Sequence, residues 1–254
     1  MKRSKTLLNL RSAPRVRPDT LIGQLLYGEP MMEVADSSTA GWSKVKAKIQ
    51  TGEVKEGYVA TRYLRESVSD GKENLMYNGI KEWQRFDYGQ AKEFMDPYYK
   101  YVGEMWQSIQ MDLDGRDRDV PWSAAFISFV VRNAGPGYAG FTFAAAHARY
   151  IHDAIHQRIT GTQSPFWGYR LQEEKPQLGD MVCAWREVRT DFDHAKNHRY
   201  FKSHCDIIIE IKQANVKAIG GNVSNSVAIK NYQLDGNGFL RPTRNVFALL
   251  KNLT

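Results

Sequence analysis

The 254-residue sequence predicts an α+β protein that begins with a small β-barrel and continues into a larger part, where helices precede an antiparallel sheet. Three observations lead to this prediction. Turn residues divide residues 6–66 into short strands, apolar residues then recur at helical spacing, and the last third returns to short apolar runs typical of strands.

The barrel is predicted from apolar runs that alternate with turns. The runs cover residues 8–10, 21–25, 31–35, 42–46 and 56–60, and proline or glycine lies between most of them. Strands this short and this regularly spaced suit a barrel of five or six strands. We therefore assign residues 1–66 to a first domain and the polar residues 67–75 to a linker.

The second domain, residues 76–254, is predicted from a change of period. Aromatic and aliphatic residues between 83 and 109 fall near a 3.6-residue spacing, and clear helices are expected over 124–133 and 147–159. Strands are then expected at 181–185, 207–211, 216–220 and 247–250. Helices followed by consecutive strands are typical of an α+β fold.

Composition narrows the classes of function. Hydrophobic residues make up 42% and charged residues 25%, which excludes a disordered, collagenous or coiled-coil protein. The formal charge of +7 favours a polyanionic partner, but no nucleic-acid-binding signature accompanies it, so no nucleic-acid partner is expected. No apolar run is long enough to span a membrane, so we expect no membrane insertion. No secretory signal opens this chain, so the sequence leaves open whether it is cytosolic, exported by another route or trimmed of its signal. We expect a monomer.

Metal or cofactor chemistry is not expected. Cys183 and Cys205 form no C-x-x-C pair, and each lies in an apolar run, as a buried inert thiol would. His152 and His156 have the i, i+4 spacing of zinc ligands, but the glutamate of an H-E-x-x-H motif is missing.

The amino-terminal segments resemble the bacterial SH3 domain. The segments L-N-L-R-S-A-P (8–14), I-G-Q-L (22–25), G-E-P (28–30), G-W-S-K-V (41–45), G-Y-V-A (57–60) and Y-L (63–64) follow that family's order. The resemblance implies that residues 1–66 bind cell-wall peptides or polymers.

Three residues of the second domain suggest nucleophilic catalysis. Ser123 begins a predicted helix, His204 begins a strand, and Asn222 ends the next one. A nucleophile at a helix amino terminus faces unpaired backbone N–H groups and the positive end of the helix dipole. A histidine on a rigid strand can accept its proton, provided that a third polar group orients the ring. Asp206 shares a strand face with His204 and is the alternative orienting group.

Four segments here resemble papain-like peptidoglycan hydrolases of the NlpC and CHAP type. They are P-W-S-A-A-F (121–126), P-Q-L-G-D-M-V (176–182), S-H-C-D-I (203–207) and I-G-G-N-V-S-N-S-V (219–227). The segment A-H-A-R-Y-I (146–151) is similar to one found in a subfamily that also has W-S-A-A-F. The resemblance implies catalytic roles for Ser123, His204 and Asn222, and a substrate-binding role for His147. Asn222 therefore ranks ahead of Asp206, which rests on the strand alternation alone.

The serine at position 123 is a departure, because cysteine is the nucleophile in that family. A thiol starts near pKa 8.5 and a serine hydroxyl far higher, so serine needs concerted help from a base. A working serine enzyme, an engineered replacement of cysteine and an inactive site all remain open. Trp122 and Trp167 are candidates either for the wall of the substrate groove or for the core.

We therefore expect a peptidoglycan hydrolase that cuts an amide bond of the stem peptide or its junction with the glycan. It would act at the cell wall, in the periplasm or outside the cell, as a phage lysin, a toxin or a secreted enzyme, with an immunity or delivery protein as a further partner. The alternatives are an inactive wall-binding adaptor and an esterase with the same triad. The absence of a G-x-S-x-G elbow argues against the esterase.

Overall fold

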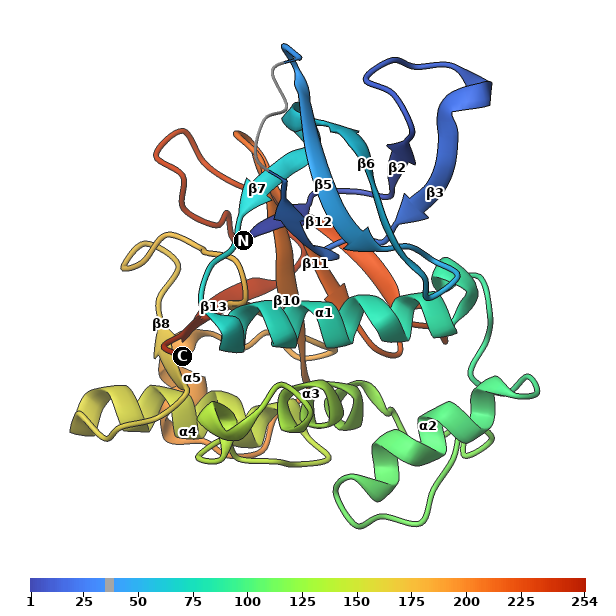
Figure 1. Cartoon of the computed structure of the whole chain (residues 1–254). Coiled ribbons are helices and arrows are strands. Elements are labelled where there is room, and N and C mark those ends of the chain that lie inside the picture. Colours follow the sequence, from blue (N-terminus) through green and yellow to red (C-terminus); the bar gives the residue numbers. More distant parts are fainter. Residues whose placement is uncertain (35–38) are drawn as a thin grey trace. The chain divides into compact units, whose positions relative to one another are not determined.

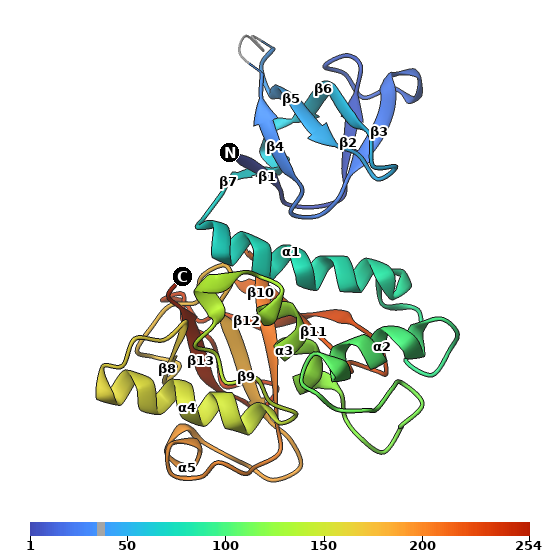
Figure 2. The same ribbon diagram turned by 60° about the horizontal axis from the view of Figure 1, so that its bottom comes forward.

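The computed structural model describes residues 1–34 and 39–254, which form two compact units. The first unit is Met1–Glu73 and the second is Asn74–Thr254. Figures 1 and 2 show strands throughout the first unit and helices together with strands in the second. The predicted α+β class is confirmed. Within the described residues, no helix is both long and apolar enough to cross a membrane.

The first unit is one antiparallel sheet of seven strands. Its strands are β1 (Lys2–Ser4), β2 (Leu8–Arg11), β3 (Leu21–Leu25), β4 (Pro30–Glu33), β5 (Trp42–Lys48), β6 (Val54–Ala60) and β7 (Leu64–Glu66), in the spatial order β3-β2-β6-β5-β4-β1-β7. Alternate side chains on β2 and β5 are buried, which is the two-residue period of strands with one face on a core. That core consists of Leu8, Leu10, Leu25, Met31, Val45, Ala47, Ile49, Val59 and Leu64.

The second unit is a six-stranded antiparallel sheet with helices packed against it. Its strands are β8 (Phe166–Tyr169), β9 (Met181–Trp185), β10 (Ser203–Ile211), β11 (Asn215–Gly220), β12 (Ala228–Gln233) and β13 (Val246–Asn252), in the order β12-β11-β10-β9-β13-β8. Its helices are α1 (Asp70–Arg85), which starts in the first unit, α2 (Tyr98–Gln107), α3 (Ser123–Arg132), α4 (His147–Thr160) and α5 (Phe192–Asn197). Helices α3 and α4 pack against the central strand β10 (Figure 2).

Strand β10 separates two buried layers. Ile208 belongs to a core cluster, and His204 and Asp206 project from the same side of the strand because they lie an even number of residues away. Cys205, Ile207 and Ile209 alternate with them and project from the other side. Six consecutive residues of this strand are buried, from His204 to Ile209 and including the polar pair, so both faces of the sheet are covered at its centre.

Two segments differ from the sequence-based expectation. Residues 70–75, assigned above to the linker 67–75, form the start of α1. The reason is Glu73, whose buried carboxylate accepts hydrogen bonds from Arg65 and from the Val68 N–H, so a polar stretch is tied down. Residues 192–197, expected in a polar loop, form the short helix α5, which the Asp191 side chain caps by accepting a hydrogen bond from the His194 N–H.

The packing of β8 on α4 gives a test of the fold. A Cβ added at Gly168 would lie 3.0 Å from the backbone N and Cα of Ile155, which cannot move independently of α4. We expect Gly168→Ala to lower the free energy of unfolding by about 1–3 kcal/mol. Urea unfolding followed by tryptophan fluorescence measures this, because every tryptophan except Trp42 lies in the second unit.

Gly236→Ala is the matched control, since a Cβ there would meet nothing within 4 Å. This variant should unfold within about 0.5 kcal/mol of the wild type. Equal stability of the two variants would contradict the described contact between β8 and α4.

Candidate active site

Ser123 is the first residue of α3 and lies against the core. Its exposed fraction is 7%, and the next four residues of the helix are almost fully buried, which fixes the helix start in place. Trp122, just before it, stacks on Phe86 with ring centroids 5.6 Å apart, and its indole N–H donates to the buried Glu93. The backbone N–H groups of the first helical turn have no acceptor within the helix.

The hydroxyl of Ser123 is hydrogen-bonded to His147, the first residue of α4. The distance from Ser123 Oγ to His147 Nε2 is 2.7 Å. On the other side of this ring, the Cys205 N–H donates to Nδ1 over 3.2 Å, and the Tyr150 hydroxyl lies within hydrogen-bonding distance of the same nitrogen. Strand β10 pairs with β11 only from Ile207 onwards, which leaves the Cys205 N–H available.

These contacts fix the hydrogen on His147. A nitrogen that accepts from a backbone N–H cannot carry a hydrogen itself, so the neutral ring has its hydrogen on Nε2. Burial and the neighbouring His204 hold the pKa of His147 well below its usual value, so the ring is neutral. Burial also raises the pKa of Tyr150, which keeps its hydroxyl a donor. His147 therefore donates a hydrogen bond to Ser123 and does not accept the proton of that serine.

His204 and Asp206 form the second buried pair of the site. His204 Nε2 lies 2.8 Å from Asp206 Oδ1, and Arg186 Nη2 lies 3.1 Å from His204 Nδ1. Arginine has no acceptor, so Nδ1 carries the lone pair and Nε2–H donates to the carboxylate. Burial lowers the pKa of His204, although Asp206 opposes this effect. The His204 and His147 rings are neighbours, with centroids 5.1 Å apart.

Asp206 is fully buried and remains ionised. Burial alone would raise its pKa, but His204 and Lys230 outweigh burial and hold the pKa well below the usual range. Lys230 Nζ lies 2.6 Å from Oδ2, and the Tyr232 hydroxyl donates to the same oxygen. These two residues of β12 share a strand face and reach across β11 to β10.

The glycines of the G-G-N segment have a steric role. A Cβ at Gly220 would lie 1.8 Å from Asp206 Oδ1, and one at Gly221 would lie 2.4 Å from the Cβ of Phe126 in α3. The first glycine leaves room for the carboxylate, and the second lets the chain pass close to the helix that carries Ser123. Only glycine fits either position without displacing the site.

The structure brings Ser123, His147, His204 and Asp206 into one cluster, in which His147 contacts both Ser123 and His204. Asp206, and not Asn222, makes the contact that orients His204. In the described part of the chain no hydrogen bond joins Asn222 to His204, and Asn222 lies in a turn with a φ of 53°.

Neither predicted tryptophan lines the cluster. Trp122 has an exposed fraction of 2% and belongs to the core. Trp167 lines another cavity, together with Pro165 and the terminal Thr254.

Three residues of this site, Arg186, Lys230 and Tyr232, are absent from the sequence-based prediction. Lys230 and Tyr232 alternate on a strand, a pattern equally typical of any solvated edge. Arg186 follows β9 with no motif around it. Their roles depend on strand order, which local spacing does not reveal.

The cluster offers little to a metal ion. Within residues 1–34 and 39–254, no three His, Cys, Asp or Glu side chains are arranged to hold one. Cys183 and Cys205 are free and buried, with their sulfur atoms 2.9 Å apart. Burial raises the pKa of Cys205 well above its usual value, so this thiol is protonated and is not a thiolate nucleophile.

Residues 93–248 match a family described as an uncharacterized protein conserved in bacteria, DUF2272. The chain belongs to this family. The matched residues of the DUF2272 chain include Ser123, His147, His204 and Asp206, and lie wholly within the second unit. No curated protein matches the chain.

Among solved structures, the DUF2272 chain is similar to NlpC2 from Trichomonas vaginalis. The identity is 14%, the match covers 100% of this chain and 72% of that one, and the TM-score is 0.28.

The buried histidines of the DUF2272 chain predict acid sensitivity. Their pKa values are lowered on folding, so below about pH 6.5 the unfolded chain binds more protons than the folded one. As the pH decreases below that point, the free energy of unfolding should decrease by about 1.4 kcal/mol per pH unit for each imidazole. Urea unfolding at pH 7.5, 6.5 and 5.5 measures the slope.

His147→Gln should remove the contribution of one imidazole from this slope, whatever its effect on the free energy of unfolding at pH 7.5. His198→Gln, which changes an exposed histidine just after α5, should keep the wild-type slope. A slope unaffected by His147→Gln would contradict a neutral, buried His147.

Proposed function

We propose that this chain is a hydrolase that cleaves an amide bond of peptidoglycan, with Ser123 as nucleophile and His204 as general base. The His204–Asp206 pair carries the proposal, because it holds an imidazole with its lone pair on Nδ1 in the same cluster as a hydroxyl at a helix amino terminus. Asp206 fixes the tautomer by accepting from Nε2, the role that a carboxylate has in serine hydrolases.

The proposed reaction has two steps. The Ser123 hydroxyl attacks the amide carbonyl and its proton passes to His204 Nδ1, through a water where the two are not in contact. The C–O bond forms, the C–N bond breaks, and His204 returns the proton to the amine that leaves. Water then cleaves the ester with His204 again as base, which gives a carboxylic acid and the free serine.

The surroundings of Ser123 support this reaction electrostatically. The unpaired N–H groups at the start of α3 are placed to stabilise a developing oxyanion. His147 donates its Nε2–H to Ser123 Oγ, which favours the alkoxide over the neutral hydroxyl. The two histidines thus have separate tasks: His147 holds the nucleophile and His204 takes its proton.

The choice of peptidoglycan rests on sequence resemblance. The segments around Ser123, Asp180, His204 and Asn222 resemble NlpC and CHAP hydrolases, and the first unit resembles bacterial SH3 domains. The antiparallel sheet of that unit and its half-buried Trp42 and Tyr58 are compatible with wall binding. We therefore place the action of this protein at the bacterial cell wall, outside the cytoplasmic membrane.

A wall-binding protein without turnover is the second candidate, and one observation favours it. The lone pair of His204 already accepts from Arg186, and His147 presents a hydrogen, not a lone pair, to Ser123. In this arrangement no base contacts the serine proton. This candidate predicts binding to sacculi without release of fragments.

Digestion of purified sacculi by the full chain separates the two candidates. We expect the wild type to release muropeptides, Ser123→Ala to lose about 10³-fold or more of the rate, and His204→Gln to lose about 10²-fold or more. Chromatography of the soluble products measures both the rate and the bond cut. His198→Gln is the control for replacing a histidine outside the cluster.

Release by wild type no greater than by Ser123→Ala would overturn the hydrolase. If both proteins still sediment with sacculi, the binding candidate stands. Ser123→Cys shows whether the site accepts the thiol of related enzymes, since a thiolate gains more than a hydroxyl from the helix dipole and a nearby imidazole.

A further inference from the structure

A cavity of about 500 Å³ opens beside His204 and is rich in cations. It lies within the second unit, and His204 and Tyr232 form part of its wall. The other lining residues come from the end of β9, from β12 and from the loop before β13. They are Ala184, Trp185, Arg186, Glu187, Lys230, Arg244 and Asn245.

The charges of this cavity do not cancel. Lys230 is engaged by the buried Asp206, and Glu187 is engaged by Lys202 at 2.6 Å. No carboxylate within 4.0 Å is found for Arg186 or Arg244 in the described part of the chain. Two guanidinium groups, both exposed, thus face an open cavity with no anion to pair with.

Arg186 also contacts the proposed base. Its Nη2 lies 3.1 Å from His204 Nδ1, and arginine is always charged and only donates. While this contact lasts, the lone pair needed for proton transfer is occupied. A carboxylate offers a guanidinium two parallel acceptors and a full charge, so it competes well with a neutral imidazole nitrogen.

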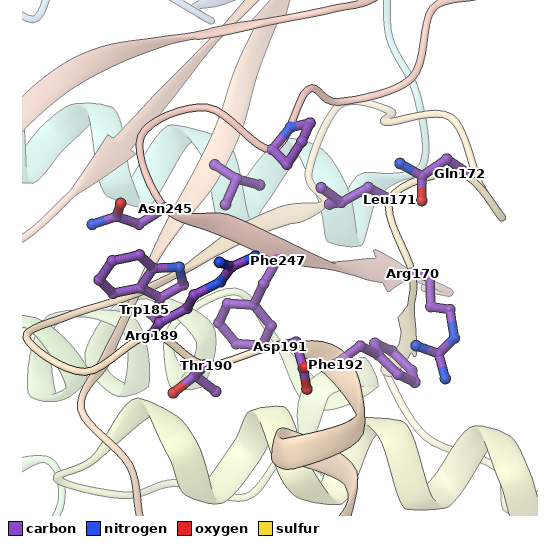
Figure 3. Close-up of a pocket in the computed structure, with 12 residues that line it drawn as sticks. Arg170, Leu171, Gln172, Trp185, Arg189, Thr190, Asp191, Phe192, Asn245 and Phe247 are labelled. Carbon is purple, nitrogen blue, oxygen red and sulfur yellow. The ribbon is translucent and has the colours of Figure 1, made fainter.

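A second cavity shares two lining residues with the first and differs from it in the rest of its lining. Trp185 and Asn245 line both, and Figure 3 shows these two side chains close together at one end of the second cavity. That cavity, of about 410 Å³, has a mixed lining, in which Leu171, Phe192 and Phe247 supply apolar surface and Arg189 and Asp191 supply charge. A ligand that reaches across Trp185 would have a charged group beside His204 and an apolar part beyond it.

We propose that this pair of cavities binds an acidic peptide, with a carboxylate held between Arg186 and Arg244 and the neighbouring part of the peptide lying past Trp185. The carboxylate takes over the hydrogen bonds of Arg186 and so releases Nδ1 of His204. The substrate of the proposed hydrolase is then a peptide with a free carboxylate, and its binding prepares the base. The binding of the peptide stands without the proposed function, and only the role of its binding in preparing the base rests on that function.

Calorimetry tests the binding without turnover. The protein is the full chain with Ser123→Ala, and the probes are N-acetyl-L-alanyl-D-glutamic acid, with two carboxylates, and its diamide, which has the same shape and no charge. We expect the diacid to bind about tenfold or more tightly than the diamide. Arg186→Gln or Arg244→Gln should remove that preference.

Arg241→Gln is the matched control, because Arg241 is exposed on the same loop as Arg244 but does not line either cavity. It should bind like the parent protein. Equal binding of the two probes, no measurable binding of the diacid, or unchanged binding by Arg186→Gln and Arg244→Gln would each overturn the proposal. None of these readings depends on whether sacculi are digested.

The release of His204 has its own readout, the pKa of its imidazole measured by NMR. The groups that face this ring are Arg186 after β9, Asp206 on β10, Lys230 and Tyr232 on β12, and His147 on α4. Of these, only Arg186 meets the added carboxylate directly in the proposal. Neutralising a cation beside an imidazole favours its charged form.

The diacid should therefore raise the pKa of His204 in the parent protein, as should Arg186→Gln without ligand, and the diamide should not. Glutamine is neutral and shorter than arginine, so this variant removes both the charge and the Nη2 contact from His204 Nδ1. A His204 pKa that does not respond to the diacid would overturn the release of the base, even if the diacid binds.

Discussion

The buried carboxylate of Asp206 is the constraint on which the centre of this protein depends. An ionised group without solvent is strongly unfavourable unless other groups pair with it. Here His204 comes from the same strand and Lys230 and Tyr232 from β12, while Gly220 on the strand between leaves the necessary space. Lys230 supplies the counter-charge and the other two partners supply hydrogen bonds, so the order β12-β11-β10 and the orientation of His204 are coupled.

The same network determines what the histidines can do. His204 gives its Nε2–H to Asp206, and His147 receives the Cys205 N–H on Nδ1, so each ring carries its hydrogen on Nε2. One ring therefore presents a hydrogen to Ser123, and the other presents a lone pair to Arg186 and the cavity. Two neighbouring imidazoles differ in role because their other nitrogens have different partners.

Local sequence patterns predicted the helices and strands better than they predicted the side-chain contacts of the candidate site. The helices expected over 124–133 and 147–159 are α3 and α4, and the strand expected over 181–185 is β9, because each has a continuous period and clear ends. The hydrogen bond of Ser123 to His147 joins two helix starts separated by a loop, and no spacing encodes it. Arg186 and Lys230 reach the site through strand order, and the start of α1 was missed because Glu73 is buried by partners distant in sequence.

The central claim is that His147 is a donor to Ser123 and that His204 holds the available lone pair. Long-range ¹H–¹⁵N correlation spectra of the imidazole nitrogens test it most directly, with His147→Gln and His204→Gln used for assignment. The account predicts two neutral rings at pH 7, both with hydrogen on Nε2 and a bare Nδ1. A hydrogen on Nδ1 of His147, or a protonated His204 at that pH, would contradict it.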